Sequence, residues 1–240
     1  MVLFDTSDSM GWEEIRGRST LDAQGRTPIE VLRQEVPGMI RGIAKEVGAT
    51  LDIAVGEFYG HNGQLKVRWL TPSGGSCAMA ESDQPFHRAN EVPITTFPVG
   101  HGGTSPISSA FKLAIDEMRR YMDKLIDQGV SVSSRPSVCV FTDGAPQSDD
   151  EDADAAMRKV QEVSEKIKVF GLGTDSSAVA YLNHVCLDAA LVLPPDQMTA
   201  ILKIVKIMST DTRGGSAASI VHRVMRDIVQ QSGRAEMDRG

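Results

Sequence analysis

The chain has 240 residues, of which 41% are apolar and 24% are charged, and its formal net charge is −7 with an isoelectric point near 5.3. These fractions are typical of a globular protein, and the length suits a single sizeable hydrophobic core. The acidic balance, without a long cluster of Lys or Arg, argues against a nucleic-acid binder that works by neutralising phosphates. No apolar stretch approaches the 18 residues that a membrane-spanning helix needs, so we expect no membrane partner.

The start of the chain gives an expectation about location. Only Val2, Leu3 and Phe4 separate Met1 from Asp5, which leaves no room for the charged and apolar regions of a signal peptide. The three cysteines lie far apart and show neither a CxxC motif nor zinc-ligand spacing. We therefore expect a cytoplasmic protein.

Hydrophobic periodicity predicts strands that alternate with helices along the chain. Two strands separated by a Gly-containing turn, 50–60 and 64–72, predict an antiparallel pair, and we interpret the Gly-, Ser- and Pro-rich stretch 72–100 as a long loop or small insertion. The pattern predicts further strands at 1–5, 136–144, 168–173 and 189–194, and helices at 27–48, 105–129, 152–167, 177–186 and 195–210.

Alternation of this kind predicts an α/β fold with a doubly wound, mostly parallel central sheet, helices on both faces and one antiparallel edge strand. We expect one domain over residues 1–209 and a linker at 210–216, "TDTRGGS". Residues 217–240 form a tail with an amphipathic helix. This helix packs either on its own domain or on a partner.

Three polar segments fall where strands of such a sheet end. The first strand leads into "DTSDS", with Asp5, Ser7 and Ser9; Thr104 stands in "HGGTSP" before a helix; and Asp143 follows the strand "VCVFT". Hydroxyl and carboxylate oxygens without His or Cys favour a hard divalent cation, Mg²⁺ first, with Mn²⁺ or Ca²⁺ as alternatives. The competing interpretation is that the serines cap a turn and Asp143 begins one.

The order DxSxS, GGTS and FTDG resembles the metal-ion-dependent adhesion site (MIDAS) of von Willebrand factor A (vWA) domains. The resemblance implies a vWA fold and carries five metal ligands onto this chain: Asp5, Ser7, Ser9, Thr104 and Asp143. The chain also contains "TDGAPQSDD", "VFGLGTDSS" and "MTAILKIVKIMST". With these segments it is similar, across residues 1 to about 210, to the bacterial TerY-like subgroup, which is linked with tellurite resistance and stress response. That similarity implies a PP2C-type phosphatase and a protein kinase as partners.

Asp8 departs from the family pattern, in which a small residue is usual. A third carboxylate would raise the affinity for a cation and weaken the attraction for an acidic partner. Alternatively, Asp8 points to solvent or caps a local turn.

Three functions remain open from the sequence. The first is a protein-protein interaction module, not an enzyme, in which a partner's Asp or Glu completes the coordination of a bound Mg²⁺. The second is a phosphatase of the haloacid-dehalogenase type with Asp5 as nucleophile, although Ser7 stands where that chemistry needs a second Asp. The third is a scaffold subunit in which the metal site is only structural.

Overall fold

The computed structural model describes residues 1–12, 14–15, 18–22, 24–48, 50–73, 76–97, 102–132, 135–143, 152–193, 202, 204–207, 216–223 and 226. The predicted linker 210–216 lies outside the described residues except for its last position, and most of the tail beyond 223 lies outside them as well. Among the described residues, no helix is long and apolar enough to cross a membrane.

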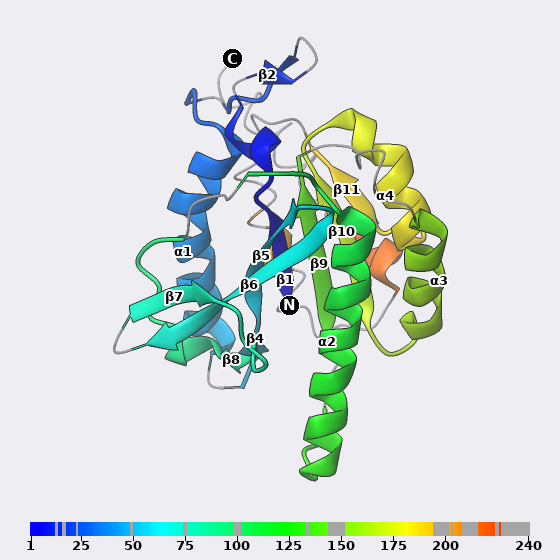
Figure 1. The fold of residues 1–240 in the computed structure, drawn as a ribbon. Coiled ribbons are helices and arrows are strands. Elements are labelled where there is room, and N and C mark those ends of the chain that lie inside the picture. Colours follow the sequence, from blue (N-terminus) through cyan, green and yellow to red (C-terminus); the bar gives the residue numbers. More distant parts are fainter. Residues whose placement is uncertain are drawn as a thin grey trace, which may run out of the picture.

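A seven-stranded sheet in the order β11-β10-β9-β1-β5-β6-β7 forms the centre of the molecule (Figure 1). Strand β1 pairs in parallel with β5 on one side and β9 on the other, and β9, β10 and β11 continue in parallel. The sheet consists of β1 (Val2–Asp5), β5 (Val55–His61), β6 (Gln64–Ser73), β7 (Ser76–Ala80), β9 (Ser137–Thr142), β10 (Lys168–Gly173) and β11 (Ala190–Val192).

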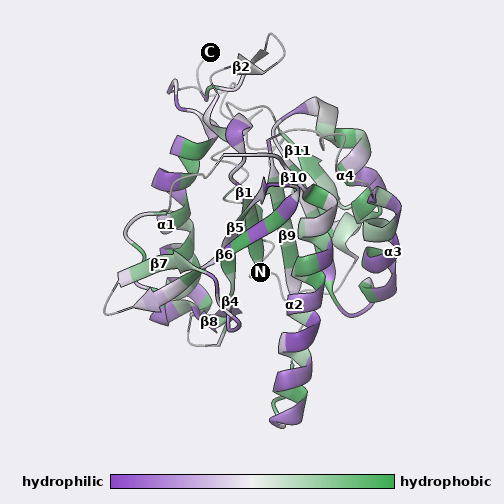
Figure 2. Ribbon diagram, viewed as in Figure 1, coloured by the Kyte–Doolittle hydropathy of each residue, from purple (hydrophilic) through white to green (hydrophobic). Residues whose placement is uncertain are grey.

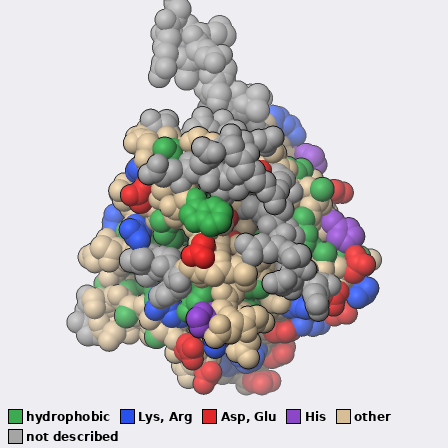
Figure 3. Space-filling model, turned by 45° about the horizontal axis from the view of Figure 1, so that its top comes forward, with side chains coloured by type: hydrophobic (Ala, Val, Ile, Leu, Met, Phe, Trp, Pro, Cys, Tyr) green, Lys and Arg blue, Asp and Glu red, His purple; other side chains and the backbone are tan. Residues whose placement is uncertain are grey.

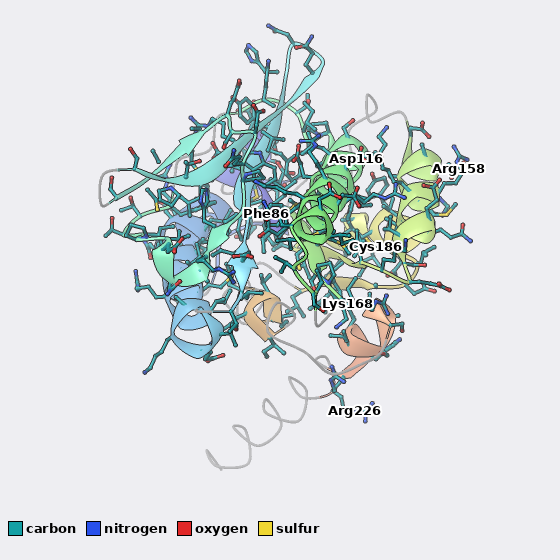
Figure 4. All side chains as sticks on the ribbon, turned by 90° about the horizontal axis from the view of Figure 1, so that it is seen from below. Phe86, Asp116, Arg158, Lys168, Cys186 and Arg226 are labelled. Carbon is teal, nitrogen blue, oxygen red and sulfur yellow. The ribbon has the colours of Figure 1, made fainter. Side chains whose placement is uncertain are left out.

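The helices cover both faces of this sheet. Viewed from below, α1 lies on one face together with the helical segments 204–207 and 217–223, and α2 and α3 lie on the other (Figure 4). The helices are α1 (Pro28–Val47), α2 (Ile107–Asp127), α3 (Ala153–Val163) and α4 (Val179–Cys186), and the 3-10 turns are η1 (Asp8–Gly11), η2 (Ala89–Glu91) and η3 (Ser176–Ala178). Two small two-stranded sheets pair β2 (Glu14–Ile15) with β3 (Arg18–Ser19) and β4 (Asp52–Ile53) with β8 (His87–Arg88).

Sequence patterning explains these elements. Helix α1 begins with a capping box in which Thr27 and Glu30 bond each other's backbone, and Pro28 occupies the first turn, where its missing N–H costs nothing. The parallel strands are hydrophobic on both faces, because helices cover both, as the green centre of the molecule in Figure 2 shows. The predicted α/β fold class is therefore confirmed.

The edge of the sheet differs from the prediction. It consists of two antiparallel strands, β6 and β7, and β7 lies within the stretch 72–100 that we expected to be a loop. Its sequence, SCAMA, places small side chains at most positions, so the contrast between its half-buried and exposed faces is too weak to indicate a strand. The same stretch also contributes β8 and η2.

The described part of the tail packs on its own domain. Residues 217–223 are helical, and Ile220 and Val221 are buried in the hydrophobic core. Of the two interpretations of this helix, packing on its own domain accounts for these two side chains.

Candidate metal centre

The candidate site lies at the carboxyl end of the central strand. Asp5 is the last residue of β1, and Asp143 follows directly after β9, the parallel neighbour of β1. From β1 the sheet continues to β5, β6 and β7 on one side, and the later strands β9, β10 and β11 lie on the other side. The strand order therefore reverses at β1. Ligands of doubly wound sheets bind at such switch points, outside the carboxyl ends of the strands.

The turn after β1 gathers the first polar groups. The backbone N–H of Ser7 donates to Asp5 Oδ1 at 2.9 Å, and η1 then brings Ser9 Oγ to 3.1 Å from Ser7 Oγ. Ser9 Oγ also donates to Asp143 Oδ1 at 2.9 Å, which joins the two strand ends. Four of the five predicted ligands, Asp5, Ser7, Ser9 and Asp143, thus form one hydrogen-bonded cluster.

Thr104 is held differently. Its backbone pairs with Gly60 of β5 through N–H···O bonds of 2.8 and 3.3 Å, and its hydroxyl faces Gly60, where a Cβ would clash with it. In the described part of the chain, no hydrogen bond joins Thr104 Oγ1 to the four clustered residues. Thr104 therefore lies on the loop that borders the cluster, and in the described part of the chain its side chain makes no hydrogen bond to the cluster.

Ser105, the next residue after Thr104, is hydrogen-bonded to the cluster. Its buried hydroxyl donates to Ser7 Oγ at 2.7 Å, and a further hydrogen bond from Ser105 favours the charged form of Asp5. The sequence interpretation missed Ser105, although the second hydroxyl in "GGTS" was the available signal. Thr104 and Ser105 are consecutive residues, so both hydroxyls belong to the same loop.

Further groups at the same edge were also missed. Thr142, the last residue of β9, donates from Oγ1 to Asp5 Oδ2 at 2.9 Å, and Thr174 Oγ1 lies 3.5 Å from the Asp143 carbonyl oxygen. Asp175 follows β10 and acts on Asp143 by charge. Each stands at or just beyond the carboxyl end of a strand, so its position in the sheet was the signal.

Both carboxylates are buried where a negative charge is costly. Asp5 is fully buried and Asp143 is 2% exposed. Burial is the main cause that raises the pKa of Asp5, and hydrogen bonds from Ser7 and Thr142 oppose it. Burial, and then the charge of Asp5, raise the pKa of Asp143 to about 8, against the hydrogen bond from Ser9.

The donor set fits a divalent cation. Asp143 Oδ2 is buried and has no hydrogen-bond partner among the described residues, and within the same part of the chain no Lys or Arg pairs with Asp5 or Asp143. A bound cation would supply the missing positive charge, and two carboxylates with hydroxyl oxygens suit Mg²⁺. No group of three or more His, Cys, Asp or Glu side chains forms a metal site among the described residues, so the hydroxyls are essential to this assignment.

Asp8 lies at the rim of the cluster. It is exposed, its backbone N–H donates to the Gly103 carbonyl oxygen at 3.2 Å, and its carboxylate lies over Gly102, where a Cβ would clash with Oδ1. Gly102 has a φ of +80°, which also favours glycine there. Asp8 thus points to solvent beside the loop that carries Thr104.

Comparison with known proteins identifies the fold. No protein-family model and no curated protein matches the chain. Among solved structures, a von Willebrand factor type A protein from Catenulispora acidiphila matches with a TM-score of 0.50 and 17% identity, over 87% of this chain and 41% of that one. The chain thus spans less than half of that structure's length. It has the fold of a vWA domain.

Two other solved structures resemble the chain more weakly. Proximal thread matrix protein 1 from the mussel byssus, with a zinc-occupied MIDAS motif, has a TM-score of 0.49 and 13% identity over 85% of this chain and 46% of that one. The SpRpn10 VWA domain has a TM-score of 0.46 and 14% identity over 89% of this chain and 97% of that one.

Proposed function

We propose that the chain is a metal-dependent protein-protein interaction module. Asp5, Ser7, Ser9, Asp143 and a hydroxyl of the 104–105 loop hold Mg²⁺, and a partner protein supplies the Asp or Glu that completes its coordination. The observation that carries the proposal is the buried Asp143 side chain, whose Oδ2 lacks a partner among the described residues and which lies near the negative Asp5. A bound Mg²⁺ supplies a positive charge and an open coordination position.

The residues of the chain have separate tasks in this proposal. Asp5 and Asp143 provide the charge that retains the cation, and Ser7 and Ser9 provide neutral oxygens, which leave the cation electrophilic toward an acidic ligand. Thr142 holds Asp5 in place through its 2.9 Å hydrogen bond. The loop 102–105 offers Thr104 at its turn and Ser105 in contact with Ser7, so a small adjustment of the loop decides which hydroxyl binds.

We also propose that the chain is not an enzyme. A phosphatase that uses Asp5 as nucleophile needs an acid/base group two residues later, where this chain has Ser7, whose hydroxyl is hydrogen-bonded to Ser9 and Ser105. The cellular setting that we propose is a bacterial, cytoplasmic stress-response assembly of the tellurite-resistance type, with a PP2C-type phosphatase and a protein kinase as partners. Only the sequence resemblance to TerY-like proteins supports that setting.

Mg²⁺ titration of the purified chain by isothermal calorimetry tests the site. We expect the wild-type chain to bind Mg²⁺ with one-to-one stoichiometry, and Asp5→Ala to lose at least 90% of the binding heat. The matched control is Asp127→Ala, which removes the same charge from an exposed position at the end of α2, far from the site (Figure 1). Circular dichroism checks that both variants fold.

Two results would contradict the proposal. Mg²⁺ binding by Asp5→Ala equal to that of the wild type would remove these residues from the site. Turnover of a phosphomonoester in Mg²⁺ that disappears in Asp5→Ala would replace the binding module with the phosphatase.

A further inference from the structure

The face that carries the candidate metal centre also carries two exposed groups that the metal does not need. Asp8 is exposed at the start of η1, and Trp12, which caps the end of η1, is 52% exposed. Viewed toward this face, acidic and large hydrophobic side chains lie next to each other near its centre (Figure 3). Three of the four clustered residues are by contrast buried: Asp5, Ser7 and Asp143 are at most 3% exposed, and Ser9 is half-buried.

The backbone of η1 fixes Trp12 close to the metal centre. The N–H of Trp12 donates to the Ser9 carbonyl oxygen at 3.1 Å, and the Trp12 carbonyl oxygen accepts a hydrogen bond from Thr20 Oγ1. The first of these bonds closes the last turn of η1, so the backbone of Trp12 lies next to that of Ser9. The main chain is thus anchored on both sides while the indole stays in solvent, and exposed Trp is typical of the centre of protein interfaces.

Asp8 sets the charge at the rim. One divalent cation balances the two buried carboxylates, Asp5 and Asp143, and leaves the exposed carboxylate of Asp8 unbalanced. No Lys or Arg forms an ion pair with Asp8 in the part of the chain that the structure describes. An acidic ligand that approaches the metal therefore meets a like charge, and a ligand with further negative charges meets more repulsion.

From this arrangement we propose that Asp8 and Trp12 form a second contact beside the metal and select partners in which the acidic residue is flanked by Arg. This inference rests on the proposed function. An Arg next to the metal-bound carboxylate places its planar guanidinium between the carboxylate of Asp8 and the face of Trp12, where it pairs with the first and stacks on the second. Asp8, which the metal chemistry leaves unexplained, is then a specificity residue.

Synthetic nonapeptides of Gly and Ser with one central Asp test this. The central Asp is flanked on both sides by Arg, by Ser or by Glu, and binding to the full chain is measured by fluorescence anisotropy in 5 mM Mg²⁺ and in EDTA. A fourth peptide, with Asn at the centre and Arg on both sides, reports attraction to the net negative chain alone. We expect the Arg-flanked Asp peptide to bind about tenfold more tightly than the Ser-flanked one, and the Glu-flanked peptide to bind most weakly.

The variants separate the two groups. We expect Asp8→Asn to reduce the preference for Arg to about threefold and to strengthen binding of the Glu-flanked peptide, whereas Trp12→Ala weakens the Arg-flanked peptide only. Trp12→Phe should restore part of that loss, because a smaller aromatic face remains. Asp127→Asn, an exposed charge removed elsewhere, should leave the order and size of all affinities unchanged.

The outcomes distinguish this inference from the proposed function. Mg²⁺-dependent binding of all Asp peptides with equal affinity, or a preference for Arg that Asp8→Asn leaves at its wild-type size, overturns the role of Asp8 and Trp12 alone. Equal binding in Mg²⁺ and in EDTA, or binding of the Asn peptide as tight as that of its Asp counterpart, overturns the metal-bridged function and the inference with it.

Discussion

Replacing Asp143 by Asn should make the metal-free protein more stable and at the same time abolish its stabilisation by Mg²⁺. Asn keeps the acceptor oxygen for Ser9 Oγ, which now lies 2.9 Å from Asp143 Oδ1, and removes a negative charge that is 2% exposed. In the wild type without a cation, burying that charge, or protonating the carboxylate to avoid it, lowers the free energy of unfolding. Asp143→Asn therefore has opposite effects on two quantities: it raises the stability of the metal-free protein and removes the stabilisation by Mg²⁺.

Burial is the main cause that raises the pKa of Asp143 from 3.8 to about 8. This pKa determines by how much Asp143 lowers the free energy of unfolding, and how that cost depends on pH. Below about pH 4 the group is protonated in both the folded and the unfolded state, so it costs nothing. Between pH 4 and 8 the cost grows by about 1.4 kcal/mol per pH unit. At pH 7 its upper limit is about 4 kcal/mol, and at pH 5 about 2 kcal/mol, and structural relaxation lowers both.

Thermal unfolding in EDTA and in 10 mM Mg²⁺ checks this prediction. In EDTA at pH 7 we expect Asp143→Asn to unfold roughly 5–12 °C above the wild type, since about 1 kcal/mol corresponds to about 2–4 °C for a chain of this size. The gain should be about half as large at pH 5. Mg²⁺ should raise the unfolding temperature of the wild type and leave that of the variant unchanged. A variant less stable than the wild type in EDTA would refute the argument that an uncompensated charge is buried there.

Two further substitutions test contacts around the site. Arg68→Met removes an ion-pair partner of the buried Glu57, and burial raises the pKa of Glu57 to about 7. The contribution of Glu57 to stability is therefore full below about pH 4.5 and falls as the pH rises to 7. We expect urea denaturation to show that Arg68→Met lowers the free energy of unfolding by about 3 kcal/mol at pH 8 and by much less at pH 5. Gly60→Ala places a Cβ against Thr104 Oγ1 and should cost about 1–3 kcal/mol and weaken Mg²⁺ binding in calorimetry, whereas Gly38→Ala on the exposed side of α1 should do neither.

The sequence predicts the parts of the site that short-range pattern determines. Asp5 and Asp143 each follow a strongly hydrophobic strand, and parallel strands in a doubly wound sheet bring such ends to one edge. The spacing of Ser7 and Ser9 then follows from a tight turn. These four residues meet in the structure as the pattern predicts, and whether they bind a cation remains a prediction.

The remaining features depend on tertiary contacts that no local pattern encodes. Thr104 and Ser105 offer the same functional group. The backbone pairing of Thr104 with Gly60, more than 40 residues earlier in the chain, accompanies the hydrogen bond of Ser105 to Ser7, and the Thr104 hydroxyl faces Gly60. The pair formed by Glu57 and Arg68 depends on the register between β5 and β6. The sequence shows two charged residues in alternating strands, and only the register brings them together on one face of the sheet.

Asp8 and Trp12 are placed by the same turn that places the metal ligands, and this explains how one short segment serves two purposes. The hydrogen bonds of η1 use backbone groups and the side chains of Ser7 and Ser9, so the side chains at 8 and 12 are not needed for the turn. Substitution at these two positions can therefore change which partner binds without changing how the cation is held. The ligands of the cluster determine affinity for the metal, whereas positions 8 and 12 face the partner, so the two properties should vary independently. A reduced preference for Arg-flanked peptides in Asp8→Asn, with unchanged Mg²⁺ affinity, is the signature of that separation.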